Sequence, residues 1–158
     1  QICDDVGHTG FVSGLKGQVM VGLSHHVGRN LLQAGAPLGR RLPVDASSTG
    51  RALLALKTDE QVYELLGGQL SLASSHSPST FEELFHRLAL VRERGYSESF
   101  EEAGKGVAAV SVAVEKPRSG EAASLCITYP IATVDDKDRS HTIGLLLRAK
   151  ADLTRVLS

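Results

Sequence analysis

The sequence has little of what marks several large classes of protein. Its 158 residues include only two cysteines and five prolines, and 17 Lys and Arg residues are balanced by 18 Asp and Glu residues. Because the basic residues form no stripe, direct binding of nucleic acid by this chain is not expected. With 42% hydrophobic residues, the composition excludes a disordered or collagen-like chain and indicates one globular domain, residues 1–158, with its own core.

The sequence also lacks the marks of membrane insertion and of a disulfide framework. Its longest apolar runs fall far short of the roughly 18 to 20 residues that a membrane-spanning helix needs, so no contact with a membrane is expected. Cys3 and Cys126 are far apart and form no CxxC motif, which favours a reduced, cytoplasmic location. The first residue is Gln1 rather than Met, and we expect further residues to precede it in the whole protein.

Alternating apolar residues indicate the strands of the domain. Residues 9–23 alternate on either side of Gly17, a pattern that predicts a β-hairpin. Segments 107–114 and 122–128 also alternate, and each would have one face of bulky residues and one face of small, partly polar residues. A loop after the hairpin is marked by Pro37, Gly39 and Pro43.

Helices are predicted between and after these strands. Ser47, Ser48 and Thr49 are candidates to cap a helix that begins near residue 48. The sequence from Thr80 has the form of a capping box and opens the most regular amphipathic segment, which ends at Gly95. Two further helices are predicted, from Asp59 and from about Asp138. Since the connections are short, we expect an α+β fold in which an antiparallel sheet is flanked by α-helices.

Two features of this arrangement could bind a small polar ligand. At the turn Ser47-Ser48-Thr49-Gly50, hydroxyls and unpaired backbone N–H groups would meet at a helix N-terminus, which suits a carboxylate. Helix capping by Ser48 or Thr49 explains the same residues without a ligand. The second feature is the small face of the two strands, on which either a helix packs closely or a ligand sits. This small face comprises Ala109, Ser111, Ala113, Ser124, Cys126 and Thr128.

No group of residues has the pattern of a catalytic or metal centre. His25 and His26 would point to opposite faces of a strand and so would not chelate one metal ion together. Cys126 has no obvious base near it in the sequence, which favours a core or pocket thiol over a nucleophile. Glu101 and Glu102 are adjacent acids of the kind that is usually solvated. We therefore expect no enzyme activity, no metal and no cofactor.

Three blocks of the chain resemble IclR-family transcription regulators. Residues 39–55, GRRLPVDASSTGRALLA, are similar to the effector-domain signature G-x-x-L-P-x-x-A-S-x-x-G-K/R-A-x-L-A. Residues 94–107 resemble the family's R-G-Y, E-E and G-V stretch, and residues 127–130 resemble its S-x-S-G-P strand end. The resemblance covers nearly the whole chain. It implies a GAF-like α+β fold that binds a small metabolite.

The resemblance also implies which residues line the ligand pocket. The corresponding positions are Ser48, Thr49, Gly50, Ser99, Ala109, Cys126 and Thr128, with Ala34, Leu42 and Val107 as apolar walls. Family members that bind small keto acids have an acidic side chain at the place of Ser99 and a larger one at that of Ala34. The pocket here is therefore expected to be roomier, and a larger organic or aromatic acid is at least as good a candidate as a pyruvate-sized effector.

The same resemblance implies the partners. Homo-oligomers are expected, as dimers or dimers of dimers, and DNA would be bound only through an upstream winged helix-turn-helix domain that this chain does not contain. Two alternatives stay open from the residues alone. One is a free-standing GAF-like sensor module of a signalling protein, and the other is a small hydrolase that uses Cys126 or a serine as nucleophile.

Overall fold

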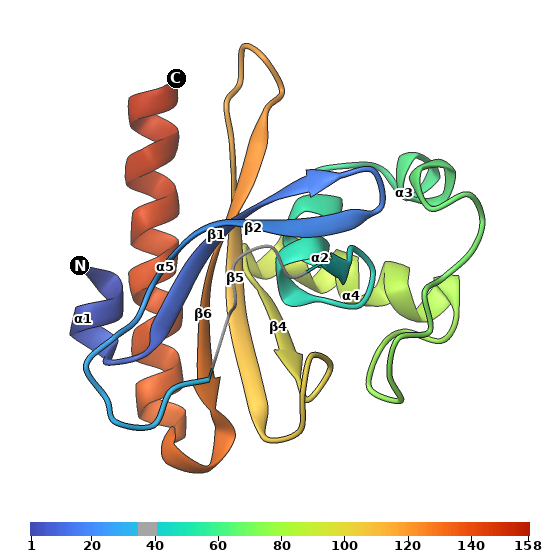
Figure 1. Cartoon of the computed structure of the whole chain (residues 1–158). Helices are drawn as coiled ribbons and strands as arrows, with labels where there is room; N and C mark the ends of the chain where they lie inside the picture. Colours follow the sequence, from blue (N-terminus) through green and yellow to red (C-terminus); the bar gives the residue numbers. More distant parts are fainter. Residues whose placement is uncertain (35–40) are drawn as a thin grey trace.

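The domain is built on one antiparallel sheet that has helices on both faces (Figure 1). The structure, a computed structural model, describes residues 1–34 and 41–158, so Pro37 and Gly39 of the predicted loop lie outside the described residues. The sheet order is β3-β2-β1-β6-β5-β4, and every neighbouring pair is antiparallel. The strands are β1 (Thr9–Lys16), β2 (Val19–His26), β3 (Arg41–Pro43), β4 (Ser97–Phe100), β5 (Val107–Glu115) and β6 (Ala122–Pro130).

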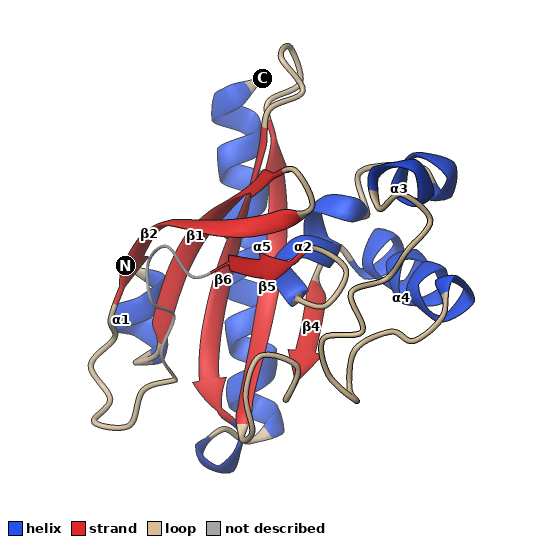
Figure 2. Ribbon diagram, turned by 45° about the vertical axis from the view of Figure 1, so that its right-hand side comes forward, coloured by secondary structure: helices blue, strands red, loops and turns tan. Residues whose placement is uncertain are grey.

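The helices are grouped by the face of the sheet that they cover. Figures 1 and 2 show α1 and α5 on one face and α2, α3 and α4 on the other. Their bounds are α1 (Ile2–Val6), α2 (Ser48–Leu54), α3 (Asp59–Leu65), α4 (Phe81–Arg94) and α5 (Asp136–Leu157), with one 3-10 turn at Ile131–Thr133. The predicted antiparallel sheet flanked by α-helices is therefore confirmed. In the described part of the chain, no helix is apolar over a length that could cross a membrane.

The two faces of β5 and β6 differ as the alternation predicts. Val110, Val112 and Ile127 are buried on the side of α5, where they pack against Leu146 of that helix. The small face lies under α2, because Ala113 packs in the same cluster as Leu53 of α2. Bulky side chains thus fill the space beneath a long helix, whereas small ones let a short helix approach the sheet closely.

The predicted hairpin and helix starts are found, with small shifts. β1 and β2 join through a tight turn in which Gly17 has a φ of 62°, a conformation that glycine adopts without strain. Thr80 caps α4 as predicted, since its side chain accepts the N–H of Glu83. The carboxylate of Glu83 does not complete the box, however, because it accepts the N–H of Ser79. α1, β3 and β4 were not predicted.

Candidate ligand-binding site

The predicted ligand-binding residues of the sheet lie in two adjacent rows across the small face. In the first row, β4, β5 and β6 place Ser99 opposite Ala109 and Ala109 opposite Thr128. In the second row, Ser111 lies opposite Cys126. Residues directly opposite each other on antiparallel strands point to the same face. The sheet thus brings together four of the predicted site residues, which lie far apart in the sequence.

The second row is closed by α2. The hydroxyls of Ser48 and Ser111 lie 2.8 Å apart, and both hydrogen-bond the thiol of Cys126. All three residues are buried. Burial raises the pKa of the Cys126 thiol to about 12, although the two hydroxyls partly oppose this effect. Close packing of a helix therefore accounts for this row, and Cys126 is a neutral thiol at physiological pH rather than a nucleophile.

The N-terminus of α2 is capped by Ser47, not by Ser48 or Thr49. The Ser47 hydroxyl accepts the N–H of Gly50 at 3.1 Å and donates to the main-chain oxygen of Pro43 at 3.0 Å. Thr49 donates to the same hydroxyl at 3.3 Å. Ser47 is the capping residue because its backbone is extended, so that its side chain can reach the free N–H groups of the first turn of α2. A Cβ at Gly50 would overlap the main chain of Val44, so this glycine lets α2 pack closely.

In the first row, Thr128 is tied to a predicted wall residue. Its hydroxyl donates to the main-chain oxygen of Ala34 at 2.8 Å and lies 3.3 Å from that of Thr9. Gln33 holds the same segment in place, because its amide donates to the oxygens of Gly7 and Asn30 while its own oxygen accepts from Thr9. Thr128 thus fixes the approach of the chain at Ala34, and its hydroxyl proton is already engaged.

The other two predicted walls occupy different places. Val107 lies on β5 on the same face as Ala109, next to the first row. Leu42 lies on the edge strand β3, where it is paired with Met20 and packed against the core beneath α2. The sheet order places β2, β1 and β6 between Leu42 and Val107. The strand register therefore places Val107 beside the first row and Leu42 away from it.

A buried ion pair beside the site was not predicted. Arg51 of α2 donates to both carboxylate oxygens of Glu102, and each side chain is only 2% exposed. The expectation that both acids are solvated is therefore wrong for Glu102, while the side chain of Glu101 is 35% exposed. The physical reason is that α2 lies against the sheet and carries the Arg51 guanidinium inward, where it needs a buried counter-charge. Both residues lie in blocks that carry the family resemblance.

The edge strand β4 connects the two helical layers through Glu98. The main-chain oxygen of Glu98 accepts from Arg51 at 2.9 Å. Its carboxylate accepts from Arg139 of α5, with Nε at 2.6 Å and Nη2 at 2.5 Å. Hydrogen bonds to Glu98 raise the pKa of Arg139, so this guanidinium stays charged at all physiological pH values. One residue is thus held from both faces of the sheet.

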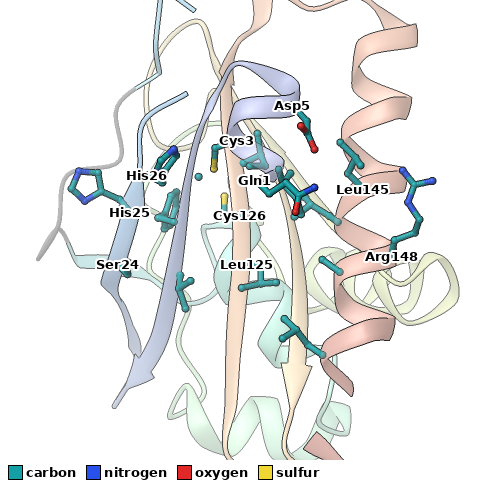
Figure 3. A pocket seen from close by; sticks show the side chains of 18 of the residues that line it. Gln1, Cys3, Asp5, Ser24, His25, His26, Leu125, Cys126, Leu145 and Arg148 are labelled. Atoms are coloured by element: carbon teal, nitrogen blue, oxygen red, sulfur yellow. The ribbon is translucent and has the colours of Figure 1, made fainter. Parts of the chain in front are cut away.

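An open, mainly apolar hollow of 710 Å³ lies between α1, α5 and the adjoining strands. Figure 3 shows Cys3 and Cys126 near its centre, His25 and His26 on one side, and Leu145 and Arg148 of α5 on the other. Apart from Cys126, none of the predicted site residues lines it. The rows of the small face and this hollow are therefore separate features of the domain.

Comparison with known proteins identifies relatives along nearly the whole chain. The family model "Bacterial transcriptional regulator IclR C-terminal" matches residues 1–155. The Escherichia coli regulator XynR is 31% identical over 95% of this chain and 59% of its own length. The E. coli transcriptional repressor IclR is 30% identical over 79% of this chain and 46% of its own length. The chain thus spans about half the length of the curated relatives it matches.

The fold also matches solved structures. The inducer-binding domain of the Acinetobacter transcription factor PobR, a double mutant in complex with 3-hydroxybenzoic acid, superposes with a TM-score of 0.82. That match is 24% identical and covers 96% of this chain and 89% of the PobR chain. The matched family consists of transcription regulators rather than enzymes. Residues 1–158 therefore belong to the IclR family of bacterial transcriptional regulators and correspond to its C-terminal domain.

Proposed function

We propose that this domain binds a small organic acid on the small face of its sheet and passes that signal to the rest of a transcription regulator. The observation that carries the proposal is the row Ser99–Ala109–Thr128, in which two hydroxyl-bearing side chains flank an alanine. Small side chains in a row leave volume for a ligand body. The Ser99 hydroxyl would donate to a carboxylate, whereas the Thr128 hydroxyl, whose proton is engaged by Ala34, would accept from a hydroxyl substituent of the ligand. The acid bound to the PobR domain, 3-hydroxybenzoic acid, is a small organic acid that has both a carboxylate and a hydroxyl.

The remaining predicted site residues divide into two roles in this proposal. Thr49 and Gly50 would form the wall beside the ligand by contact, because the Thr49 hydroxyl and the Gly50 N–H are already bonded to Ser47. Val107 and Ala34 would contact the apolar part of the ligand. Ser48 and Cys126 would support the site from beneath, because their polar atoms are already bonded to each other and to Ser111. Leu42, on the edge strand β3, would lie outside the site.

The output of the domain is proposed from its family. The whole regulator would bind DNA through an upstream winged helix-turn-helix domain, would act in the cytoplasm as a dimer or a dimer of dimers, and would not be an enzyme. The balanced charge of this chain supports a division of labour in which another part contacts the phosphates. The raised pKa of Cys126 argues against a thiol nucleophile at its centre.

Thermal unfolding and calorimetry with a panel of acids test the proposal. The panel contains 3-hydroxybenzoate, benzoate, pyruvate and glyoxylate. A ligand at 100 times its dissociation constant should stabilise the domain by about 2.7 kcal/mol. Ala109→Val should fill the row and weaken binding of the best acid, whereas Ala151→Val on the exposed surface of α5 is the matched control. Unchanged binding by a folded Ala109→Val domain would exclude the row as the site.

A further inference from the structure

A groove of 380 Å³ lies between the loop after α3 and the first turn of α4, and none of the proposed effector-binding residues lines it. Its apolar lining comes from Leu70, Leu72 and Phe81. Tyr63 of α3 borders the groove, because its ring lies 4.8 Å from that of Phe81, and a Cβ at Gly68 would lie 3.0 Å from its hydroxyl oxygen. We call Tyr63, Leu70, Leu72 and Phe81 the α3–α4 patch.

Two large apolar side chains of the patch are open to solvent. Leu72 is 64% exposed and Tyr63 is 50% exposed. Leu72 also has a φ of 50°, in the left-handed region where the backbone of a leucine is strained. The N–H and the hydroxyl of Ser71 both donate to the buried carboxylate of Asp45 at 3.0 Å, so the strained residue is anchored from inside the domain. An exposed leucine that is both strained and anchored points to a contact with another molecule.

The patch is flanked by carboxylates that have no counter-charge. Glu60 and Glu64 lie on either side of Tyr63 along α3, Glu82 follows Phe81 in α4, and all three are exposed. Within residues 1–34 and 41–158, none of the three forms an ion pair, and residues 58–86 contain no Lys or Arg. The other acids at the two helix starts are already paired with arginines, as Asp59–Arg92 and Glu83–Arg87. The surface is therefore apolar at its centre and negative around it.

We propose that the α3–α4 patch is a docking surface for a basic amphipathic helix of a partner protein. The apolar face of that helix lies in the groove against Leu72 and Phe81, and its Lys and Arg residues meet the free glutamates. A helix supplies both features at once, because its apolar stripe is bordered by polar positions along its length. The negative surround excludes nucleic acid as the partner. This surface is independent of the proposed effector site.

Fluorescence anisotropy with a labelled amphipathic helix of about 14 lysine and leucine residues tests the surface, since this probe carries only the proposed chemistry. The 158-residue chain should bind it saturably. A matched peptide with glutamate in place of every lysine should not bind. A scrambled lysine–leucine peptide, which has no apolar face, should bind about 10-fold more weakly.

Leu72→Asn tests the apolar centre of the patch. It should weaken binding of the lysine–leucine helix by about 5- to 10-fold, because one buried apolar contact is lost. Asparagine adopts the left-handed backbone more readily than leucine does, so the loop keeps its conformation. Leu31→Asn is the matched control, since Leu31 is a fully exposed leucine outside the patch.

The triple variant Glu60→Gln/Glu64→Gln/Glu82→Gln tests the charges. It should weaken binding by about 10-fold or more at low ionic strength and should reduce the dependence of the affinity on salt. A control of the same net charge replaces three exposed acids elsewhere and should bind like the parent. These replacements are Glu93→Gln, Glu115→Gln and Glu121→Gln.

Parent-like binding by either Leu72→Asn or the triple variant of the patch overturns the proposal, as does equal binding of the lysine and glutamate peptides. No saturable binding at about 1 mM lysine–leucine helix overturns it as well. Sedimentation without peptide identifies a second copy of this chain as a different occupant. If Leu72→Asn abolishes self-association of the parent and neither protein binds the peptide, the patch is a contact between copies rather than a site for a basic partner.

Discussion

Arg51 and Glu102 face each other in the interior of the domain as a bidentate pair, with Nη1–Oε1 and Nη2–Oε2 distances of 2.8 and 2.5 Å. Arg51 also donates to the main-chain oxygens of Asp45 and Glu98. The pair therefore joins α2, which carries the signature serines, to the loop after β4. Almost no water reaches either charge, so each depends on the other.

Removing one member of this pair should destabilise the domain strongly. Arg51→Met keeps an apolar stem of similar length but leaves the buried Glu102 charge with only the longer 3.4 Å contact from Arg87. The expected cost is about 3 to 5 kcal/mol in the free energy of unfolding. The double variant Arg51→Met/Glu102→Leu should be less destabilised than Arg51→Met, because no unpaired charge remains. Urea unfolding of the three proteins measures both effects. A single variant within about 1 kcal/mol of the parent would contradict the burial of the pair.

Thr128→Val should loosen the segment that ends at Ala34. Valine has the shape of threonine but has no hydroxyl, so the Ala34 oxygen loses its 2.8 Å donor at a cost of about 1 to 3 kcal/mol. Thr128→Ser retains the hydroxyl and is the matched control. Amide hydrogen exchange should then be faster at residues 30–34 in the valine variant only. Equal exchange in the two variants would show that the hydroxyl does not hold this segment.

Cys126 should resist thiol reagents in the folded domain. Its raised pKa leaves almost no thiolate at pH 8, and its burial excludes the reagent. Cys3 is partly exposed, so it should react, although burial also raises its pKa and slows the reaction. A chromogenic disulfide should therefore modify one thiol per chain in buffer and two in urea. The Cys3→Ser variant should show no reactive thiol until it is unfolded, which would identify Cys3 as the thiol that reacts in the folded domain.

The stability of the domain should fall as the pH drops below 6.5 because of His8. This residue is buried beside Tyr129, with ring centroids 6.0 Å apart, and burial lowers its pKa although Asp138 opposes the effect. A histidine with a lowered pKa in the folded state takes up its proton more readily when unfolded. The stability that the neutral His8 contributes is therefore fully present above pH 6.5, the pKa of histidine in the unfolded chain. This stability is lost as the pH falls from there through the lower pKa of His8 in the folded domain.

His8→Gln should therefore flatten the pH dependence of unfolding between pH 6.5 and about 5, above the range in which carboxylates titrate. His141 lies exposed on α5, so His141→Gln is the control and should keep the slope of the parent. Urea unfolding at several pH values gives the comparison. If the free energy of unfolding of His8→Gln depends on pH as steeply as that of the parent, groups other than His8 cause the loss of stability.

The parts of the fold that the sequence predicts are those with a strong periodic pattern. Segments 107–114 and 122–128 alternate between bulky and small residues, and both extend only slightly further as β5 and β6. The row of Ser99, Ala109 and Thr128 is different, because it needs the register of three strands. The family resemblance named these residues, and the strand pairing explains why they lie together.

The parts that the sequence does not predict are those where tertiary contacts override hydropathy. In β4, Ser97 and Ser99 are buried while Phe100 is 45% exposed, the reverse of the usual pattern. This inversion arises because Ser97 and Ser99 lie opposite Ser111 and Ala109, on the small face of the sheet that packs closely under α2. β3 has only three residues and owes its form to pairing with β2, so it has no period of its own.

The pairing of β1 with β6 also dictates when the sheet can form. The hydrogen bond between Ser13 and Ser124 joins residues 111 positions apart, and that between Thr128 and Thr9 spans 119. Contacts of such high sequence separation must pay the entropy of closing a long loop before they contribute, which slows folding. On a ribosome, the hairpin at residues 9–26 must wait, with its inner edge unpaired, until β6 has emerged. The exposed edge of a central strand can pair with other chains during that interval, which is a consequence of placing the two central strands at opposite ends of the chain.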